Sequence, residues 1–336
     1  MRLYQAYKNL PEPMRRRIKS VRNIARAIQD AVYDVRRFYK WSCAIRHPNN
    51  AENMIALITM EYHALEKGLS MPAPKRDFGE IRAQMLNRYL DEFGTRYSDH
   101  EAITPAKRAL AHYYTVRAES REEISKRSDG KIDPRIAVAL LDEDPSTVRI
   151  SRNDWQRDAA IDADAFFRSR RSVRDFATAE VSDEVLRRAI YLAQQSPSVC
   201  NRQGTRVHVF RKGQTLDEIL RIQNGNSGFG HLIQVAIVVT SDLRTFTSPG
   251  ERNQCWVDGG MFAMTLIWAL HALGLGSCAL NWSKDATDHR RLHKVAQIPD
   301  NEAVVMLLAV GHLKSDFLVA RSSRYTIDHI LRTHTS

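Results

Sequence analysis

The sequence predicts an α+β fold over residues 160–336, preceded by an all-α domain over residues 1–145. In the first half, apolar residues recur at helical spacing. In the second half, short apolar runs alternate with segments of helical periodicity, which is typical of a sheet covered by helices. Residues 142–165 separate the halves because they are polar and lack apolar periodicity. We therefore expect two domains joined by a linker.

The composition is that of a globular protein, with 43% hydrophobic and 26% charged residues among 336. The four cysteines lie far apart and form no C-x-x-C pair, so we expect free thiols in a reducing compartment. The first twenty residues contain no apolar segment of the signal-peptide type, which favours a cytoplasmic protein. Residues 1–50 contribute +9 of the net charge of +11, from twelve Lys/Arg and three Asp/Glu.

Residues 14–40 are predicted to form a long amphipathic, basic helix. Its apolar stripe has alternating spacings of three and four: Ile18, Val21, Ala25, Ile28, Val32, Val35 and Tyr39. Its first half carries Arg15, Arg16, Arg17, Lys19, Arg22 and Arg26. Three interpretations stay open: the helix packs on its own domain, docks a partner protein, or lies on an anionic membrane surface, at the inner face of the membrane. Nucleic acid is not an expected partner, since no recognition motif accompanies the charge.

Further elements follow from caps, stripes and turn residues. Helices are predicted over 48–69, capped by Asn50 and ended by Gly68, and over 78–94 and 100–127, before the turn residues of 128–134. Strands are predicted over 206–210, 235–240 and 303–311; two of these are continuous apolar runs and should be buried on both faces. Helices are predicted over 182–195, 215–224, 256–273 and 285–296.

The apolar stretch 261–280 approaches the length of a membrane span. It carries His271 near its centre, and Gly274 and Gly276 near its end. These residues favour a buried helix, a glycine-rich turn and a core strand.

Two segments of the second half are candidates for ligand binding. Residues 168–176, RSRRSVRDF, contain four arginines and two serines, which suit an anion such as phosphate unless the segment is simply a solvated basic turn. Residues 196–203, SPSVCNRQ, end a predicted helix and then present the amides of Asn201 and Gln203 before a strand. Carboxamides both donate and accept hydrogen bonds, so they can recognise the edge of a heteroaromatic ring.

Other candidates are weaker. His289 and His293 are four residues apart on a predicted helix but lack a third metal ligand, so we expect a surface pair and no metal site. Cys200 has no assignable basic partner, and we interpret it as a backbone contributor. Asp258 has two open roles, an ion pair with an arginine across a dimer or a carboxylate at a helix start.

Four motifs, in order, resemble the nitroreductase family of FMN-dependent oxidoreductases. They are RRSVRDF, SPSVCNRQGTRVHVF, DGGMFAMTLIWALHALGLGSCALNW, and AVGHL followed by ARSSRYTIDHIL. The resemblance spans roughly residues 163–332 and leaves an N-terminal helical extension outside it. It implies a mixed sheet flanked by helices, and a homodimer whose two subunits build two flavin sites at their interface.

The resemblance also implies the residues that bind FMN. One subunit would hold the phosphate, the ribityl chain and the pyrimidine edge with Arg170, Arg171, Ser172 and Arg174. The other subunit would contribute Pro197, Ser198, Val199, Asn201 and Gln203. Asn281 would lie near flavin N5, and Arg321 and Arg324 would close on the phosphate. No side chain is expected to act as a catalytic nucleophile, because the flavin carries the chemistry.

Two features depart from the family pattern. Gly204 and Thr205 follow Gln203 where many members have Pro-Trp. Only about two dozen residues separate the strands that end at Phe210 and begin at Val235, where many relatives carry longer helices over the flavin. We therefore hypothesise that the N-terminal helical domain replaces this shortened lid.

The expected function is electron transfer from NAD(P)H through FMN to a small-molecule acceptor, by a ping-pong mechanism. FMN is favoured over FAD because the motifs provide one phosphate site and no adenine-binding fingerprint. Two alternatives stay open. One is a flavoenzyme of the same fold that performs dehydrogenation or flavin-consuming chemistry, and the other is a non-catalytic membrane or partner adapter that retains the fold.

Overall fold

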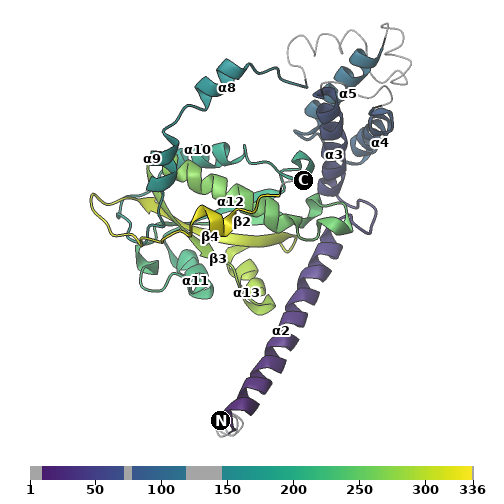
Figure 1. Cartoon of the computed structure of the whole chain (residues 1–336). Helices are drawn as coiled ribbons and strands as arrows, with labels where there is room; N and C mark the ends of the chain where they lie inside the picture. Colours follow the sequence, from purple (N-terminus) through teal and green to yellow (C-terminus); the bar gives the residue numbers. More distant parts are fainter. Residues whose placement is uncertain (1–9, 72–77, 119–145, 335–336) are drawn as a thin grey trace.

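The computed structural model describes residues 10–71, 78–118 and 146–334 (Figure 1). The first two of these segments are helical, as predicted, with α2 (Glu12–Trp41), α3 (Ala51–Leu69), α4 (Glu80–Arg96) and α5 (Ile103–Arg117). Asn50 caps α3 as expected, since its side chain accepts a hydrogen bond from the Asn53 amide at 3.0 Å. The predicted continuation of the last helix to residue 127 and the turn at 128–134 lie outside the described residues.

The second half alternates helices and strands, in agreement with the predicted order. Two short exposed helices that were not predicted come first: α8 (Arg152–Asp158) lies within the expected linker at 142–165, and α9 (Ala163–Ser169) overlaps its end. The helices that pack on the sheet are α10 (Asp183–Ala193), α11 (Gln214–Gln223), α12 (Gln254–Ala272) and α13 (Ala286–Ala296). The strands are β1 (Thr205–Arg211), β2 (Val235–Asp242), β3 (Leu275–Asn281) and β4 (Glu302–His312). A short helix, α14 (Ile327–Ile330), lies near the C-terminus.

The four strands form one sheet in the order β1-β2-β4-β3, and every neighbouring pair is antiparallel. Among the described residues, the sheet gains a parallel contact only at the isolated bridge between Ser172 and Ser277 of β3. Every residue of β2 is buried, which agrees with the continuous apolar run in its sequence.

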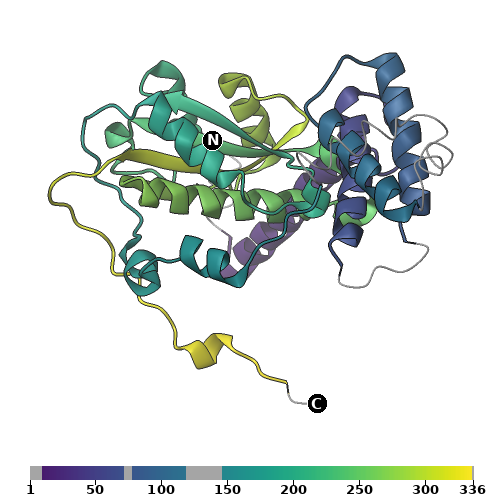
Figure 2. The ribbon, with the colours of Figure 1, turned by 90° about the horizontal axis from the view of Figure 1, so that it is seen from above.

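Helices cover both faces of the sheet (Figures 1 and 2). On one face, α10 and α12 build a core that includes Leu186, Leu266 and Leu270. On the other, α11 and α13 build a core that includes Ile219 and Leu292. The stretch 261–280 is a core helix, a turn and a strand as predicted, and in the described part of the chain no helix is both long and apolar enough to cross a membrane.

The N-terminal helices make two separate sets of contacts. Helices α3, α4 and α5 share a core of their own, with Met54, Ile58 and Leu86 fully buried. The last turns of α2 instead pack on the C-terminal half, where Phe38 lies against Phe246 at 6.2 Å between ring centroids. The domain boundaries therefore stay a prediction, because α2 contributes no residue to the α3–α5 core.

A buried polar junction fixes the two halves to each other. Asn53 of α3 donates to the carbonyls of Trp41 at 3.2 Å and of Arg244 at 2.7 Å. Arg37 of α2 is buried and donates to the carbonyls of Asp300 at 2.8 Å and Glu302 at 2.7 Å. Buried donors of this kind are costly to leave unpaired, so they define one docked arrangement.

Candidate active site

A basic cavity of about 330 Å³ brings together the arginine-rich segment and the C-terminal arginine pair. Five arginines and three serines line it, with Phe167: Arg168, Arg170, Arg171, Ser172, Arg321, Ser322, Ser323 and Arg324. No carboxylate of the described residues lines the cavity. Arg171 donates to the Arg170 carbonyl at 3.0 Å and Arg324 to the Ser322 carbonyl at 2.5 Å, so these guanidinium groups contact only neutral oxygens in the described part of the chain.

The local sequence explains why these arginines face outward. Val173 and Phe176 are buried in the core, and the Val173 amide donates to the Ser277 carbonyl of β3 at 3.0 Å. This anchors an extended segment in which Arg171 and Arg174 are exposed and Arg170 is half-buried. The Arg170 guanidinium lies over the Trp268 ring of α12, 5.7 Å from its centroid. The basic cavity is therefore positioned by the sheet edge and by α12.

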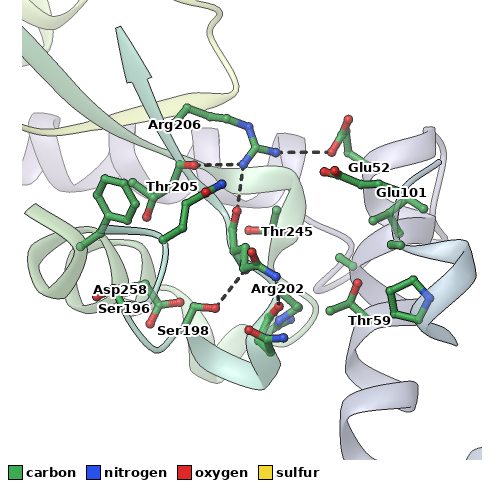
Figure 3. Close-up of a pocket in the computed structure, with 18 of the residues that line it drawn as sticks. Glu52, Thr59, Glu101, Ser196, Ser198, Arg202, Thr205, Arg206, Thr245 and Asp258 are labelled. Carbon is green, nitrogen blue, oxygen red and sulfur yellow. Dashed lines mark hydrogen bonds and ion pairs between the residues drawn. The ribbon is translucent and has the colours of Figure 1, made fainter. Parts of the chain in front are cut away.

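A second cavity, of about 610 Å³, lies at the turn formed by residues 196–203 (Figure 3). Its lining includes four of the predicted residues, Pro197, Ser198, Asn201 and Gln203. Cys200, Asn201 and Gln203 have φ angles of 50°, 54° and 50°, in the left-handed region that non-glycine residues rarely adopt. Such strained backbone persists only where its surroundings hold it, and it clusters at functional sites.

Two acidic residues hold this turn, the buried Asp258 and the half-buried Glu251. Asp258 of α12 accepts from the Val199 amide at 3.1 Å and from the Gln254 side chain at 2.8 Å. Glu251 pairs with the buried guanidinium of Arg202 at 2.5 Å. Burial alone would raise the pKa of Glu251, but hydrogen bonds from Arg202 and the Thr247 amide bring it below the ordinary value. Asp258 therefore anchors the turn within one chain, a role that the sequence analysis missed because the two segments are far apart in sequence.

The opposite wall of the second cavity comes from α3 and from the segment that leads into α5. Glu52, Thr59 and Tyr62 lie on α3, and His100 and Glu101 precede α5. Arg206 of β1 reaches toward this wall, with its guanidinium 3.7 Å from the Glu52 carboxylate (Figure 3). The N-terminal helices thus lie beside the predicted flavin-binding turn, as the hypothesis of a replaced lid requires.

The structure does not bring every predicted residue into a cavity. The two cavities have no lining residue in common. Asn281 lines neither of them, and its carbonyl accepts from the Gln223 side chain at 2.9 Å. Arg174 is exposed, and Val199 packs near Phe38 at the junction between the halves. Within one chain, the two predicted halves of the flavin site are therefore separate.

Residues 167–226 and 221–312 match the model of the nitroreductase family. This part of the chain is a nitroreductase-family domain. A curated relative from Archaeoglobus fulgidus, provisionally named NADH dehydrogenase/NAD(P)H nitroreductase, is 28% identical over 170 residues, covering 49% of this chain and 93% of the relative.

Two solved structures resemble part of the chain. The FMN-dependent nitroreductase of Clostridium difficile is 20% identical, with a TM-score of 0.43 over 51% of this chain and 99% of that one. A provisionally assigned nitroreductase of Desulfovibrio desulfuricans, solved in complex with FMN, is 22% identical, with a TM-score of 0.43 over 53% of this chain and 99% of that one.

The histidine pair of the nitroreductase domain is not the surface pair that we predicted. His289 is only 6% exposed, because α13 turns it toward Trp282, whose indole N–H donates to His289 Nδ1 at 3.1 Å. Burial lowers the pKa of His289 to about 4. In the described ranges, no three His, Cys, Asp or Glu side chains are grouped to hold a metal. All four cysteines are free thiols, as expected.

Proposed function

We propose that this protein is an FMN-dependent oxidoreductase that transfers electrons from NAD(P)H to a small-molecule acceptor. The main support is the basic cavity, where five arginines converge and, in the part of the chain that the structure describes, no carboxylate joins them. Permanent cations and serine hydroxyls are the donor set that a phosphate monoester requires. The nitroreductase domain offers one such site, which favours FMN over FAD. The name of the Archaeoglobus relative supports NAD(P)H as the donor.

Each predicted residue has a role in this proposal. Arg170, Arg171, Ser172, Arg321 and Arg324 would hold the phosphate and the ribityl chain. Arg174 would place positive charge at the pyrimidine edge, where it stabilises negative charge on the ring. The turn at residues 196–203, together with Asn281, would contact the ring from the other side. Bound flavin supplies the hydride chemistry, and a single cavity used in turn by donor and acceptor gives a ping-pong order.

We further propose a homodimer, in which the basic cavity of one subunit meets the 196–203 turn of its partner. Apolar side chains on the α12 surface are exposed in the single chain, among them Trp256, Val257 and Met264. The C-terminal segment extends away from the body (Figure 2), and its Tyr325 and Ile330 side chains are exposed. Exposed apolar side chains that gather on one surface typically mark an interface.

We propose the second cavity as the substrate cavity. Its wall from α3 and the segment before α5, the helical wall, gives it an acidic side. Glu52 and Glu101 line it from the N-terminal part, and the Arg206 guanidinium lies 3.7 Å from the Glu52 carboxylate. We expect Glu52→Gln combined with Glu101→Gln to favour anionic acceptors by on the order of 1 kcal/mol. The measurement is the ratio of kcat/KM for an anionic and an uncharged nitroaromatic, which should rise about fivefold.

Two results separate a direct effect of these glutamates on the acceptor from a purely structural role. FMN retention should be unchanged in the double variant, and Glu92→Gln on the remote surface of α4 should leave the ratio unaltered. An unchanged ratio in the double variant would mean that the helical wall does not contact the acceptor.

The test of the proposed function is the absorbance spectrum of the purified protein. We expect a flavin spectrum, release of FMN on denaturation, and oxidation of NADH or NADPH when a quinone or nitroaromatic is supplied. Colourless protein that gains no flavin on titration with FMN would favour the adapter alternative. Bound FMN without NAD(P)H oxidation would favour dehydrogenation or flavin-consuming chemistry. We expect this activity in the cytoplasm.

A further inference from the structure

Helix α2 projects from the body of the protein, and only its C-terminal turns are docked (Figure 1). It has 30 residues, which corresponds to about 45 Å at 1.5 Å per residue. Its buried residues are Arg37 and Phe38, both near its end. Most of the helix surface is therefore available for another contact.

From Ile18 to Val35 the apolar stripe of α2 faces away from the protein's own core, and only its last member, Tyr39, packs on the C-terminal half. Met14, Ile18, Val21, Ile24, Ile28, Val32 and Val35 are all between 41% and 67% exposed. Contacts with the body come instead from Asp30, which accepts from the Ala286 amide at 3.0 Å, and from Arg37. At 3.6 residues per turn these two residues lie on nearly the opposite face from Val32. The helix thus presents its apolar face to a partner outside the chain.

The charge on α2 indicates the chemistry of that partner. Six basic residues lie between Arg15 and Arg26, and Glu12 is the sole acidic residue of the helix before Asp30. Pairing with a second copy of α2 would bring these cations close together in a parallel coiled coil, since Arg15, Arg17 and Arg22 flank the stripe. An anionic surface complements both the charge and the apolar stripe.

We propose that α2 binds anionic lipid membranes and lies in the plane of the interface. The aliphatic stripe would enter the boundary between headgroups and acyl chains, and the basic side chains would contact lipid phosphates. The body would then sit on the polar side of α2, away from the bilayer. This inference rests on α2 alone and is independent of flavin binding.

The experiment is sedimentation of the full-length protein with vesicles. We expect binding to vesicles of phosphatidylcholine with 30% phosphatidylglycerol, little binding to phosphatidylcholine alone, and release at high salt, because screening weakens the attraction. Val21→Glu combined with Ile28→Glu should reduce binding at least tenfold. Arg15→Gln combined with Arg22→Gln should also reduce it, since each basic residue near the surface contributes roughly fivefold.

Asn23→Glu is the matched control, because it adds a negative charge to the exposed polar face of α2. It should reduce binding less than the Val21→Glu/Ile28→Glu variant, and the FMN content should be the same in all of these proteins. Equal binding to neutral and anionic vesicles would overturn the proposal. A second contrary outcome is a Val21→Glu/Ile28→Glu variant that binds lipid as before but has an altered sedimentation coefficient. That result would overturn the proposal and identify the stripe as an interface between copies of the chain.

Discussion

Arg170→Ala combined with Arg324→Ala is expected to yield a protein that loses its FMN during purification. Both arginines line the basic cavity, although they are 154 positions apart in the chain. Each lost charged hydrogen bond should cost about 1.5–3 kcal/mol, so the pair should weaken FMN binding by at least about a hundredfold. The measurement is the FMN-to-protein ratio, followed by titration of the apoprotein with FMN.

The controls for this pair address folding and general charge. Arg221→Ala removes an exposed cation from α11, outside the basic cavity, and should leave the FMN affinity unchanged. Single replacements by Lys should retain part of the affinity, because they keep the charge but lose the planar fork. If the double alanine variant binds FMN as tightly as the original protein, the phosphate is held elsewhere and the proposed site is wrong.

Local patterns in the sequence were sufficient to predict most of the fold. The cap at Asn50 and the stop near Gly68 predicted the two ends of helix α3. A run of apolar residues predicted β2 and its burial on both faces of the sheet. These signals depend on neighbours within a few positions. The basic cavity was also anticipated, but only because the family resemblance related residues near 170 to those near 324.

Long-range features were beyond such patterns. Nothing in the sequence links Asp258 to Val199, yet the carboxylate holds the strained turn. The stripe of α2 predicted an amphipathic helix but not the direction that it faces, since that depends on Asp30 meeting α13 and Arg37 meeting β4. His289 has the spacing of a surface pair with His293, and its burial became apparent only once α13 was placed against Trp282. In each case tertiary packing decides what local spacing leaves open.

The burial of His289 should make the protein lose stability in mild acid. Its pKa is about 4 in the folded protein, against an ordinary value of 6.5, through burial first and then through the nearby Arg37 and His293. The neighbouring carboxylates of Asp30 and Asp285 act in the opposite direction but do not compensate. Below pH 6.5 the unfolded chain therefore binds a proton at His289, which the folded chain does not bind until the pH approaches 4. The free energy of unfolding should fall by about 2–3 kcal/mol between pH 7 and pH 4.5 on account of this residue.

His289→Asn isolates this contribution, because an Asn side chain can accept the Trp282 hydrogen bond but does not titrate. At pH 7 both proteins have a neutral side chain here, and the variant should be the less stable one, through lost packing. Urea unfolding at pH 7, 5.5 and 4.5 should show the two stabilities converging as the pH falls, since only the original protein incurs the protonation penalty. Parallel pH profiles would mean that His289 takes up its proton in the folded state, which the indole N–H donated to Nδ1 disfavours. The ring centroid of His289 also lies 6.0 Å from that of Tyr33 in α2. Protonation of His289 should therefore loosen the docked end of that helix.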